Sequence, residues 1–136
     1  MGLYNFQQRF VPAILAGSKT HTIRAERKRN DMPGHWMHLY TGLRHKGARL
    51  LMRRRCVMVE FIGIETDHTV WIGHRLSLLD PHDGGGACVP GGRLFLDESE
   101  KEALAKRDGF DSFAEMIAFW NGRLPFTGLV FHWEAR

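Results

Sequence analysis

The chain has 136 residues, of which 43% are hydrophobic and 25% charged, with a formal net charge of +4, so we expect one globular domain over residues 1–136. No apolar run reaches the ~20 residues that a membrane-spanning helix needs, and the N-terminus lacks the pattern of a signal peptide. The two cysteines form no CxxC motif, which argues against a disulfide framework or a zinc site and favours the cytoplasm.

The first predicted element is a short helix over residues 10–16. Pro12 stands where proline is favoured in a first helical turn, and Phe10 and Ile14 share one face. Gly17 can end this helix, because glycine readily adopts the left-handed conformation that follows a helix. The chain is therefore predicted to leave the helix through a tight turn.

A strand over residues 20–24 is predicted directly after this turn. In an extended chain the side chains of Thr22 and Arg24 point to the same side. Lys19 can join them only if the strand begins after Lys19, which the preceding turn allows. The junction between helix and strand then gathers hydroxyl groups and cations, a mixture suited to a small polar or anionic group.

Further strands are predicted from runs in which apolar and polar residues alternate. In chain order they cover residues 36–40, 54–64, 70–72, 75–78, 93–96 and 129–133. Pro33 and Gly34 mark a turn before the first of them, and residues 42–47 are predicted to be a loop. Residues 80–92 are rich in glycine and predict a flexible loop, for which an insertion is favoured over a lid.

Two helices are predicted after the glycine-rich loop. Asp97 and Glu100 form a capping box before a helix over residues 98–107, and Ser112 and Glu115 repeat the pattern before a second helix. That second helix has a core-facing stripe at helical spacing, made of Phe113, Met116, Ile117 and Trp120. The order helix, strands, two helices, strand predicts an α+β domain with a mostly antiparallel sheet or a small β-barrel.

The segment from Phe10 to Arg24 resembles the opening signature of the ASCH domain family, an apolar helix followed by Gly-x-Lys-x-x-Thr-x-Arg. The stretch from Ala105 to Phe110, with the amphipathic helix that ends in Trp120, resembles the second block of that family. The resemblance covers most of the chain. It implies a PUA-like fold, in which helices flank a small, mostly antiparallel β-barrel and a cleft accepts nucleic acid or nucleosides.

Some single-domain members of the ASCH family are N4-acetylcytidine amidohydrolases, which release acetate from the modified base. Their catalytic set is a lysine, a threonine and a glutamate, and the motif carries the first two roles to Lys19 and Thr22. The third falls at Asp108, whose side chain is one methylene shorter than that of glutamate. The resemblance therefore implies a small hydrolase that deacylates a modified cytidine.

Hydrolysis of an amide needs a nucleophile, a base and a donor to the oxyanion. Thr22 or an activated water can be the nucleophile, and Lys19 can be the base if its pKa falls well below about 10.4. A nearby Asp108 would raise the pKa of Lys19, so its alternative role is to orient Lys19 or to shuttle a proton. Arg24 suits a carbonyl oxygen or a phosphate, because its donors form a planar fork.

Basic and aromatic residues predict contacts with RNA as well. Aromatic rings can stack on bases, and arginines can contact phosphates. The residues predicted to bind substrate or nucleic acid are Thr20, Arg24, Arg27, Trp36, Tyr40, Arg53, Arg54, Arg55 and Phe110. Two alternatives to the hydrolase stay open: an RNA-binding module without catalysis, whose arginines share one face, and a ribonuclease that cuts single-stranded RNA. The same charges are also typical of a solvated basic face that binds no partner.

We expect no resident metal and no cofactor, because the spacing of the eight histidines matches no metal-binding motif. Only the ribonuclease alternative would use a divalent ion, held together with a substrate phosphate. The predicted partner is RNA or a modified nucleoside. The sequence points to no protein partner and to no membrane.

Overall fold

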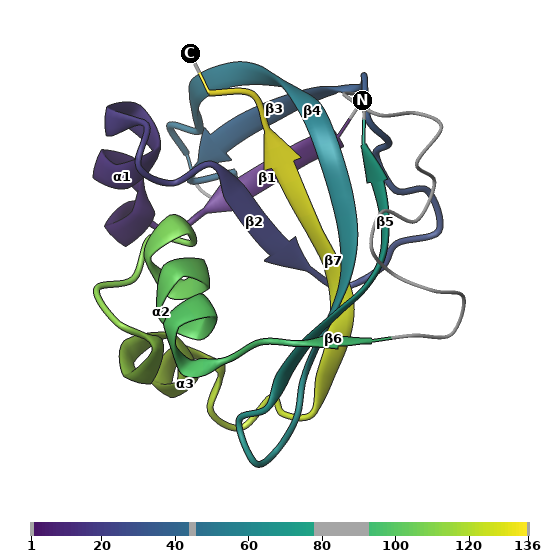
Figure 1. Cartoon of the computed structure of the whole chain (residues 1–136). Helices are drawn as coiled ribbons and strands as arrows, with labels where there is room; N and C mark the ends of the chain where they lie inside the picture. The colour runs from purple at the N-terminus through teal and green to yellow at the C-terminus, as the bar shows by residue number, and fades with distance from the viewer. Residues whose placement is uncertain (1, 44–45, 78–92, 136) are drawn as a thin grey trace.

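The computed structural model describes residues 2–43, 46–77 and 93–135, and shows a mixed α+β architecture within them (Figure 1). The glycine-rich segment 80–92 and part of the predicted loop 42–47 lie outside these residues. The strands are β1 (Gly2–Phe6), β2 (His21–Arg24), β3 (Trp36–Thr41), β4 (Arg49–Ile64), β5 (Val70–Ser77), β6 (Leu94–Phe95) and β7 (Phe126–Trp133). The helical segments are the 3-10 turn η1 (Gln8–Phe10), α1 (Val11–Ala16), α2 (Glu98–Arg107) and α3 (Phe113–Trp120).

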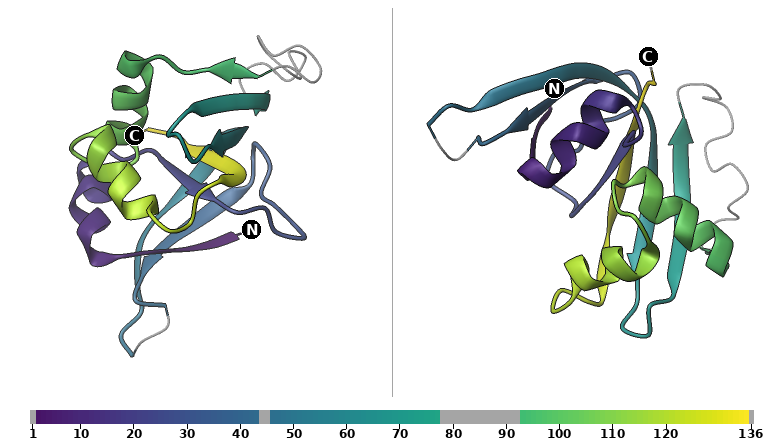
Figure 2. Two further views of the ribbon diagram at one scale, coloured as in Figure 1. Left: turned by 90° about the horizontal axis from the view of Figure 1, so that it is seen from below. Right: turned by 90° about the vertical axis from the view of Figure 1, so that its left-hand side faces the viewer.

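Strand β4 organises the sheet because it is long enough to pair with β3, β5 and β7. Its first half pairs antiparallel with β3, which pairs in parallel with β1. Its second half lies between β5 and β7, and β7 pairs with β2. In the described residues β1 and β2 remain separate edges of an open sheet. Figure 2 shows that the β3–β4 hairpin extends away from α2 and α3.

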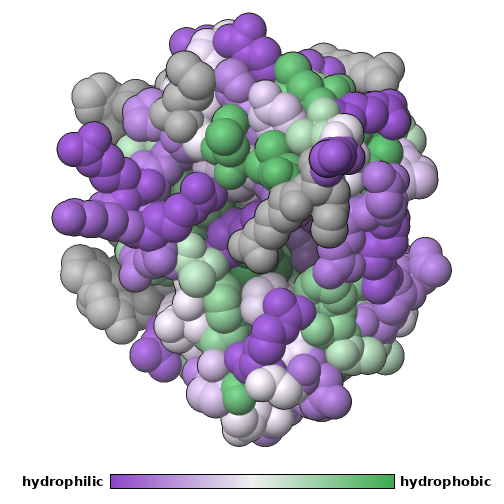
Figure 3. Space-filling view, turned by 180° about the vertical axis from the view of Figure 1, so that it is seen from behind, coloured by the Kyte–Doolittle hydropathy of each residue, from purple (hydrophilic) through white to green (hydrophobic). Residues whose placement is uncertain are grey.

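The predicted stripe on α3 is confirmed as part of the core. Met116, Ile117 and Trp120 are buried, and Phe113 packs against the same cluster of buried side chains. This amphipathic pattern stabilises the helix mainly through the apolar face that it buries. Seen from behind, the surface is largely hydrophilic and its hydrophobic residues form smaller patches (Figure 3).

The helix ends agree with the sequence in all but one detail. Gly17 ends α1 at φ 86°, and Asp97 forms the expected capping box with Glu100 at the start of α2. At α3 the Ser112 hydroxyl accepts the Glu115 N–H, but the Glu115 carboxylate pairs with Arg9 instead of completing a second box. No helix in residues 2–43, 46–77 and 93–135 is long and apolar enough to span a membrane.

The sequence prediction missed strand β1, which contributes Asn5 and Phe6 to the sheet edge, and misjudged the lengths of other strands. The structure extends the predicted strand 54–64 back to Arg49, because the added residues pair with β3. The two predicted strands 70–72 and 75–78 are one continuous strand, β5, up to Ser77. A register shift between Glu60 and Ile62 of β4 lets the pairing continue past Gly73, so the partner strand overrides the break in pattern.

Candidate functional site

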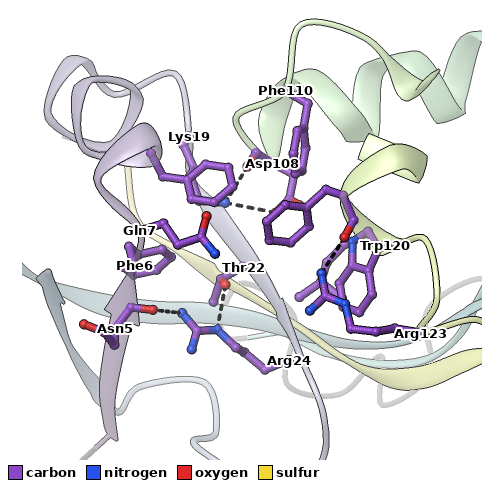
Figure 4. A pocket seen from close by; sticks show the side chains of 13 residues that line it. Asn5, Phe6, Gln7, Lys19, Thr22, Arg24, Asp108, Phe110, Trp120 and Arg123 are labelled. Atoms are coloured by element: carbon purple, nitrogen blue, oxygen red, sulfur yellow. Dashed lines mark hydrogen bonds and ion pairs between the residues drawn. The ribbon is translucent and has the colours of Figure 1, made fainter. Parts of the chain in front are cut away.

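A pocket of about 200 Å³ lies between β2, the segment after β1 and the α2–α3 region (Figure 4). It brings residues near the N-terminus together with residues more than eighty positions later in the chain. Its lining consists of Asn5, Phe6, Gln7, Phe10, Lys19, Thr22, Ile23, Arg24, Asp108, Phe110, Phe119, Trp120 and Arg123. The three predicted catalytic residues, Lys19, Thr22 and Asp108, therefore share one pocket, together with the predicted binding residues Arg24 and Phe110.

The central contact of the pocket is a buried ion pair between Lys19 and Asp108, which are 3% and 5% exposed. The Lys19 Nζ donates to Asp108 Oδ1 at 3.0 Å and to the Asp108 carbonyl oxygen at 2.5 Å. The same Nζ lies 5.0 Å from the ring centroid of Phe10 and 5.6 Å from that of Phe6. The ammonium group is thus held by two oxygens and two aromatic faces instead of by water.

Local chain geometry explains why these two side chains meet. Because β2 begins at His21, Lys19 precedes the regular strand, which is the condition the sequence analysis set. Asp108 is the C-cap of α2, and Gly109 then turns the chain at φ 99°. A Cβ atom at Gly109 would lie 3.0 Å from Phe10 Cδ1 and 3.2 Å from Lys19 Cδ. Glycine therefore permits both the turn and the close approach of Lys19.

Burial changes the acid–base behaviour of the pair. It lowers the pKa of Lys19 below its ordinary value, although the charge and hydrogen bond of Asp108 oppose the change. Burial alone would raise the pKa of Asp108, but attraction to Lys19, the hydrogen bond from Lys19 and the nearby His21 ring outweigh it, so this pKa is lowered. The pocket therefore holds an ionised carboxylate beside an amine that releases its proton more readily than a surface lysine.

His21 is a site residue that the sequence analysis missed. It is fully buried, and its Nε2 lies 3.3 Å from Asp108 Oδ1. Burial lowers the pKa of His21 to about 4, so the ring is neutral at pH 7. The available signal was its position, since His21 lies between Lys19 and Thr22 inside the same short motif.

A second polar pair continues from His21 into the sheet. His132 of β7 is the register partner of His21, and their ring centroids are 5.2 Å apart. On its other side His132 Nε2 lies 2.7 Å from Glu60 Oε1. Both His21 ring nitrogens lack a hydrogen-bond partner in the described residues, so the packing of the two rings, and not a chain of hydrogen bonds, holds His21 beside Asp108.

Arg24 holds the Thr22 hydroxyl and also bridges two sheet edges. Its Nε donates to Thr22 Oγ1 at 3.0 Å, and its Nη2 donates to the Asn5 carbonyl oxygen at 2.7 Å. The guanidinium carbon lies 4.9 Å from the ring centroid of Phe6. Because the Thr22 hydroxyl accepts this hydrogen bond, its own proton is left for a base or a ligand.

Aromatic rings form the apolar walls of the pocket. Phe10, Phe110 and Phe119 pack against one another with ring centroids 5.3–5.8 Å apart. Trp120 is 6% exposed, and its indole Nε1–H finds no partner in the described residues. A buried donor without a partner is unfavourable. The aromatic walls of the pocket suit a flat ring.

The remaining predicted binding residues lie elsewhere. Four of them lie where β3 pairs with the first half of β4, and these four do not line the pocket: Trp36, Tyr40, Arg53 and Arg55. Arg27 lies beside Tyr4, with its guanidinium carbon 4.9 Å from the ring centroid. Thr20 and Arg54 line a separate small pocket that also contains Trp133. The arginines 53–55 do not share one face as expected, because successive strand residues point to opposite sides.

Comparisons with known proteins assign this chain to no family. No model of a protein family, no curated protein and no solved structure matches this chain. Among the described residues, no three side chains of His, Cys, Asp and Glu are grouped to hold a metal ion. The ASCH resemblance rests on its two motifs, and it stays a prediction.

Proposed function

We propose that the chain is a small hydrolase that removes the acyl group from a modified cytidine, with N4-acetylcytidine as the representative substrate. The observation that carries this proposal is the buried Lys19–Asp108 pair in a pocket that also contains Thr22. The proposal includes the PUA-like barrel that the ASCH resemblance implies. The support for a barrel is the Arg24 side chain, which links β2 to the edge of β1 through its hydrogen bond to the Asn5 carbonyl oxygen.

In this proposal Lys19 is the base. Its lowered pKa increases the fraction of neutral amine near pH 7, and the neutral amine takes a proton from the Thr22 hydroxyl or from a water molecule. The resulting oxygen nucleophile adds to the acyl carbon. The C–N bond then breaks, and the proton on Lys19 passes to the departing amino nitrogen. Asp108 positions Lys19 through its hydrogen bond.

The two nucleophiles lead to the same products by different routes. If water attacks, acetate and cytidine form in one hydrolytic step. If Thr22 attacks, an acetyl ester forms on its oxygen, and water must then cleave that ester. The hydrogen bond from Arg24 to Thr22 Oγ1 supports the second route, because a positive donor stabilises a developing alkoxide.

The shape and polarity of the pocket support a single base as ligand. Its volume of about 200 Å³ is below the ~300–1,000 Å³ of sites for larger cofactors. Its aromatic walls can stack on a planar ring.

The test is release of acetate from N4-acetylcytidine by the purified chain. We expect turnover by the parent and a loss of at least about 100-fold in Lys19→Ala, since a positioned base contributes that much. Lys106→Ala is the matched control, because Lys106 lies on the exposed surface of α2. A folded parent without turnover, or full turnover in Lys19→Ala, would contradict the proposal.

Thr22→Val separates the two routes, and Thr20→Val is its control, since Thr20 lies outside this pocket. Loss of turnover in Thr22→Val, with an acetyl adduct on the parent detected by mass spectrometry, would identify Thr22 as the nucleophile. Substantial turnover in Thr22→Val would assign the attack to water. Loss in Thr20→Val alone would contradict both assignments.

A further inference from the structure

We propose that a second surface, on the outward side of β1, β3 and the first half of β4, binds single-stranded RNA. This outer sheet face consists of Leu3, Trp36, His38, Tyr40, Arg53 and Arg55. It shares no residue with the pocket, and the proposal does not depend on the hydrolase activity.

The alternation of β3 places its aromatic side chains on the outward side. Met37 and Leu39 are fully buried and point into the core. Trp36, His38 and Tyr40 therefore point the opposite way, because neighbouring strand residues alternate between faces. Trp36 is 45% exposed, which leaves much of its ring surface available to a ligand.

Arginines from the neighbouring strand join this aromatic row. Arg55 is the register partner of Trp36, and Arg53 is that of His38. The guanidinium carbon of Arg53 lies 5.1 Å from the Trp36 ring centroid. On the other side of β3, Leu3 of β1 pairs with His38 and is 53% exposed. A row of rings on β3 thus lies between arginines on β4 and the exposed apolar Leu3 on β1.

The spacing of the rings favours a single strand over a duplex. Side chains two residues apart on one face of a strand are ~6.7 Å apart. This is about twice the ~3.4 Å rise between stacked nucleotides of a double helix. Trp36, His38 and Tyr40 can therefore each meet a separate base only when the bases are splayed apart, as they are in single-stranded RNA.

The charge of this region suits a phosphate backbone. Strands β1 and β3 and residues 49–56 contain no Asp or Glu. Of the arginines in residues 49–56, Arg53 and Arg55 lie on the outer sheet face, whereas Arg54 lines a separate pocket on the other side of the strand. Glu134 approaches only at one end, where its carboxylate accepts the Arg55 backbone N–H at 3.3 Å. The Tyr40 hydroxyl adds a group that can hydrogen-bond a ribose 2′-hydroxyl, which favours RNA over DNA.

Fluorescence anisotropy with a labelled twelve-nucleotide oligouridylate tests this surface on the full chain. We expect Trp36→Ala to weaken binding about tenfold, because stacking on one aromatic side chain contributes an effect of that order. Trp36→Phe keeps a stacking ring and should retain most of the affinity. Phe61→Ala is the matched control, since Phe61 is an exposed aromatic on the other half of β4.

The charge contribution is measured through salt dependence. Arg53→Ala should weaken binding and reduce the slope of log Kd against log salt by about 0.7, the value for one phosphate contact on a single strand. Arg107→Ala, at the end of α2, should leave that slope unchanged. The proposal is overturned by absence of oligouridylate binding, by equal losses in Trp36→Ala and Phe61→Ala, or by tighter binding of the matching oligothymidylate. None of these outcomes depends on acetate release, so the two proposals fail separately.

Discussion

The pocket and the outer sheet face use cations and aromatic rings in opposite environments. In the pocket Lys19 is 3% exposed and depends on Asp108, whereas on the outer sheet face Trp36 is 45% exposed beside an exposed Arg53. Burial shifts pKa values and makes the loss of one partner costly, while exposed charges are screened and act nearly independently. Burial, more than residue type, decides what a cation can do in this protein.

The largest loss of stability is expected when the buried Lys19–Asp108 ion pair of the pocket is broken. Asp108→Ala should lower the free energy of unfolding by about 3–5 kcal/mol, because it leaves the Lys19 charge buried without a partner. Urea denaturation measures this loss. In the double variant Lys19→Met/Asp108→Ala part of the stability should return, since the unpaired charge is gone.

An exposed ion pair provides the control for this first prediction. Glu115→Ala removes the partner of Arg9 at the protein surface, and it should cost less than about 1 kcal/mol. Equal losses in Asp108→Ala and Glu115→Ala would mean that burial does not distinguish the pocket from the surface.

Acid should destabilise the folded chain through His21, which is the second prediction. Between pH 6.5 and about 4 the unfolded chain binds a proton that the folded His21 does not, so stability falls as the pH falls through this window. The contribution lost is about 3 kcal/mol. The lowered pKa of Asp108 adds a further loss below the ordinary pKa of that carboxyl group.

His21→Asn should flatten the fall of stability between pH 6.5 and about 4, as followed by urea midpoints at a series of pH values. His68→Asn is the control, because His68 is exposed. The stability of this variant should fall with pH as steeply as that of the parent chain. An unchanged acid slope in His21→Asn would assign the effect to another group.

The third prediction tests how closely the chain packs around Lys19. Gly109 and Gly17 both have positive φ, 99° and 86°, but only Gly109 is crowded, by Phe10 and Lys19. Gly17→Ala should therefore cost about 1 kcal/mol for conformation alone, and Gly109→Ala about 2–3 kcal/mol. Thermal unfolding of both variants measures the difference. Equal costs would show that the turn, and not the contact, requires glycine at 109.

The smallest effect on stability is expected on the outer sheet face. Trp36→Ala should change the free energy of unfolding by less than about 1 kcal/mol, because the ring is half-exposed. Trp120→Ala, in the pocket wall, should cost about 3–5 kcal/mol. Similar losses in the two variants would indicate that Trp36 is a structural residue and remove the contrast between the two regions.

Helix ends and helix faces were predictable because they depend on residues close in the chain. Gly17, the Asp97 cap and the α3 stripe up to Trp120 all agree with the structure. Strand limits depend on partners far away in the sequence. The early start of β4 at Arg49 and the continuity of β5 follow from pairing, which no local pattern contains.

The helix–strand junction that carries Lys19, Thr22 and Arg24 was predictable from the sequence, since these residues lie within one short motif. Tertiary packing brings Lys19 and His21 to the same Asp108 carboxylate oxygen and directs Trp36 to another surface. The physical reason is that local interactions decide which residues form a strand or a cap. Strand register and the packing of distant segments decide which side chains are buried together.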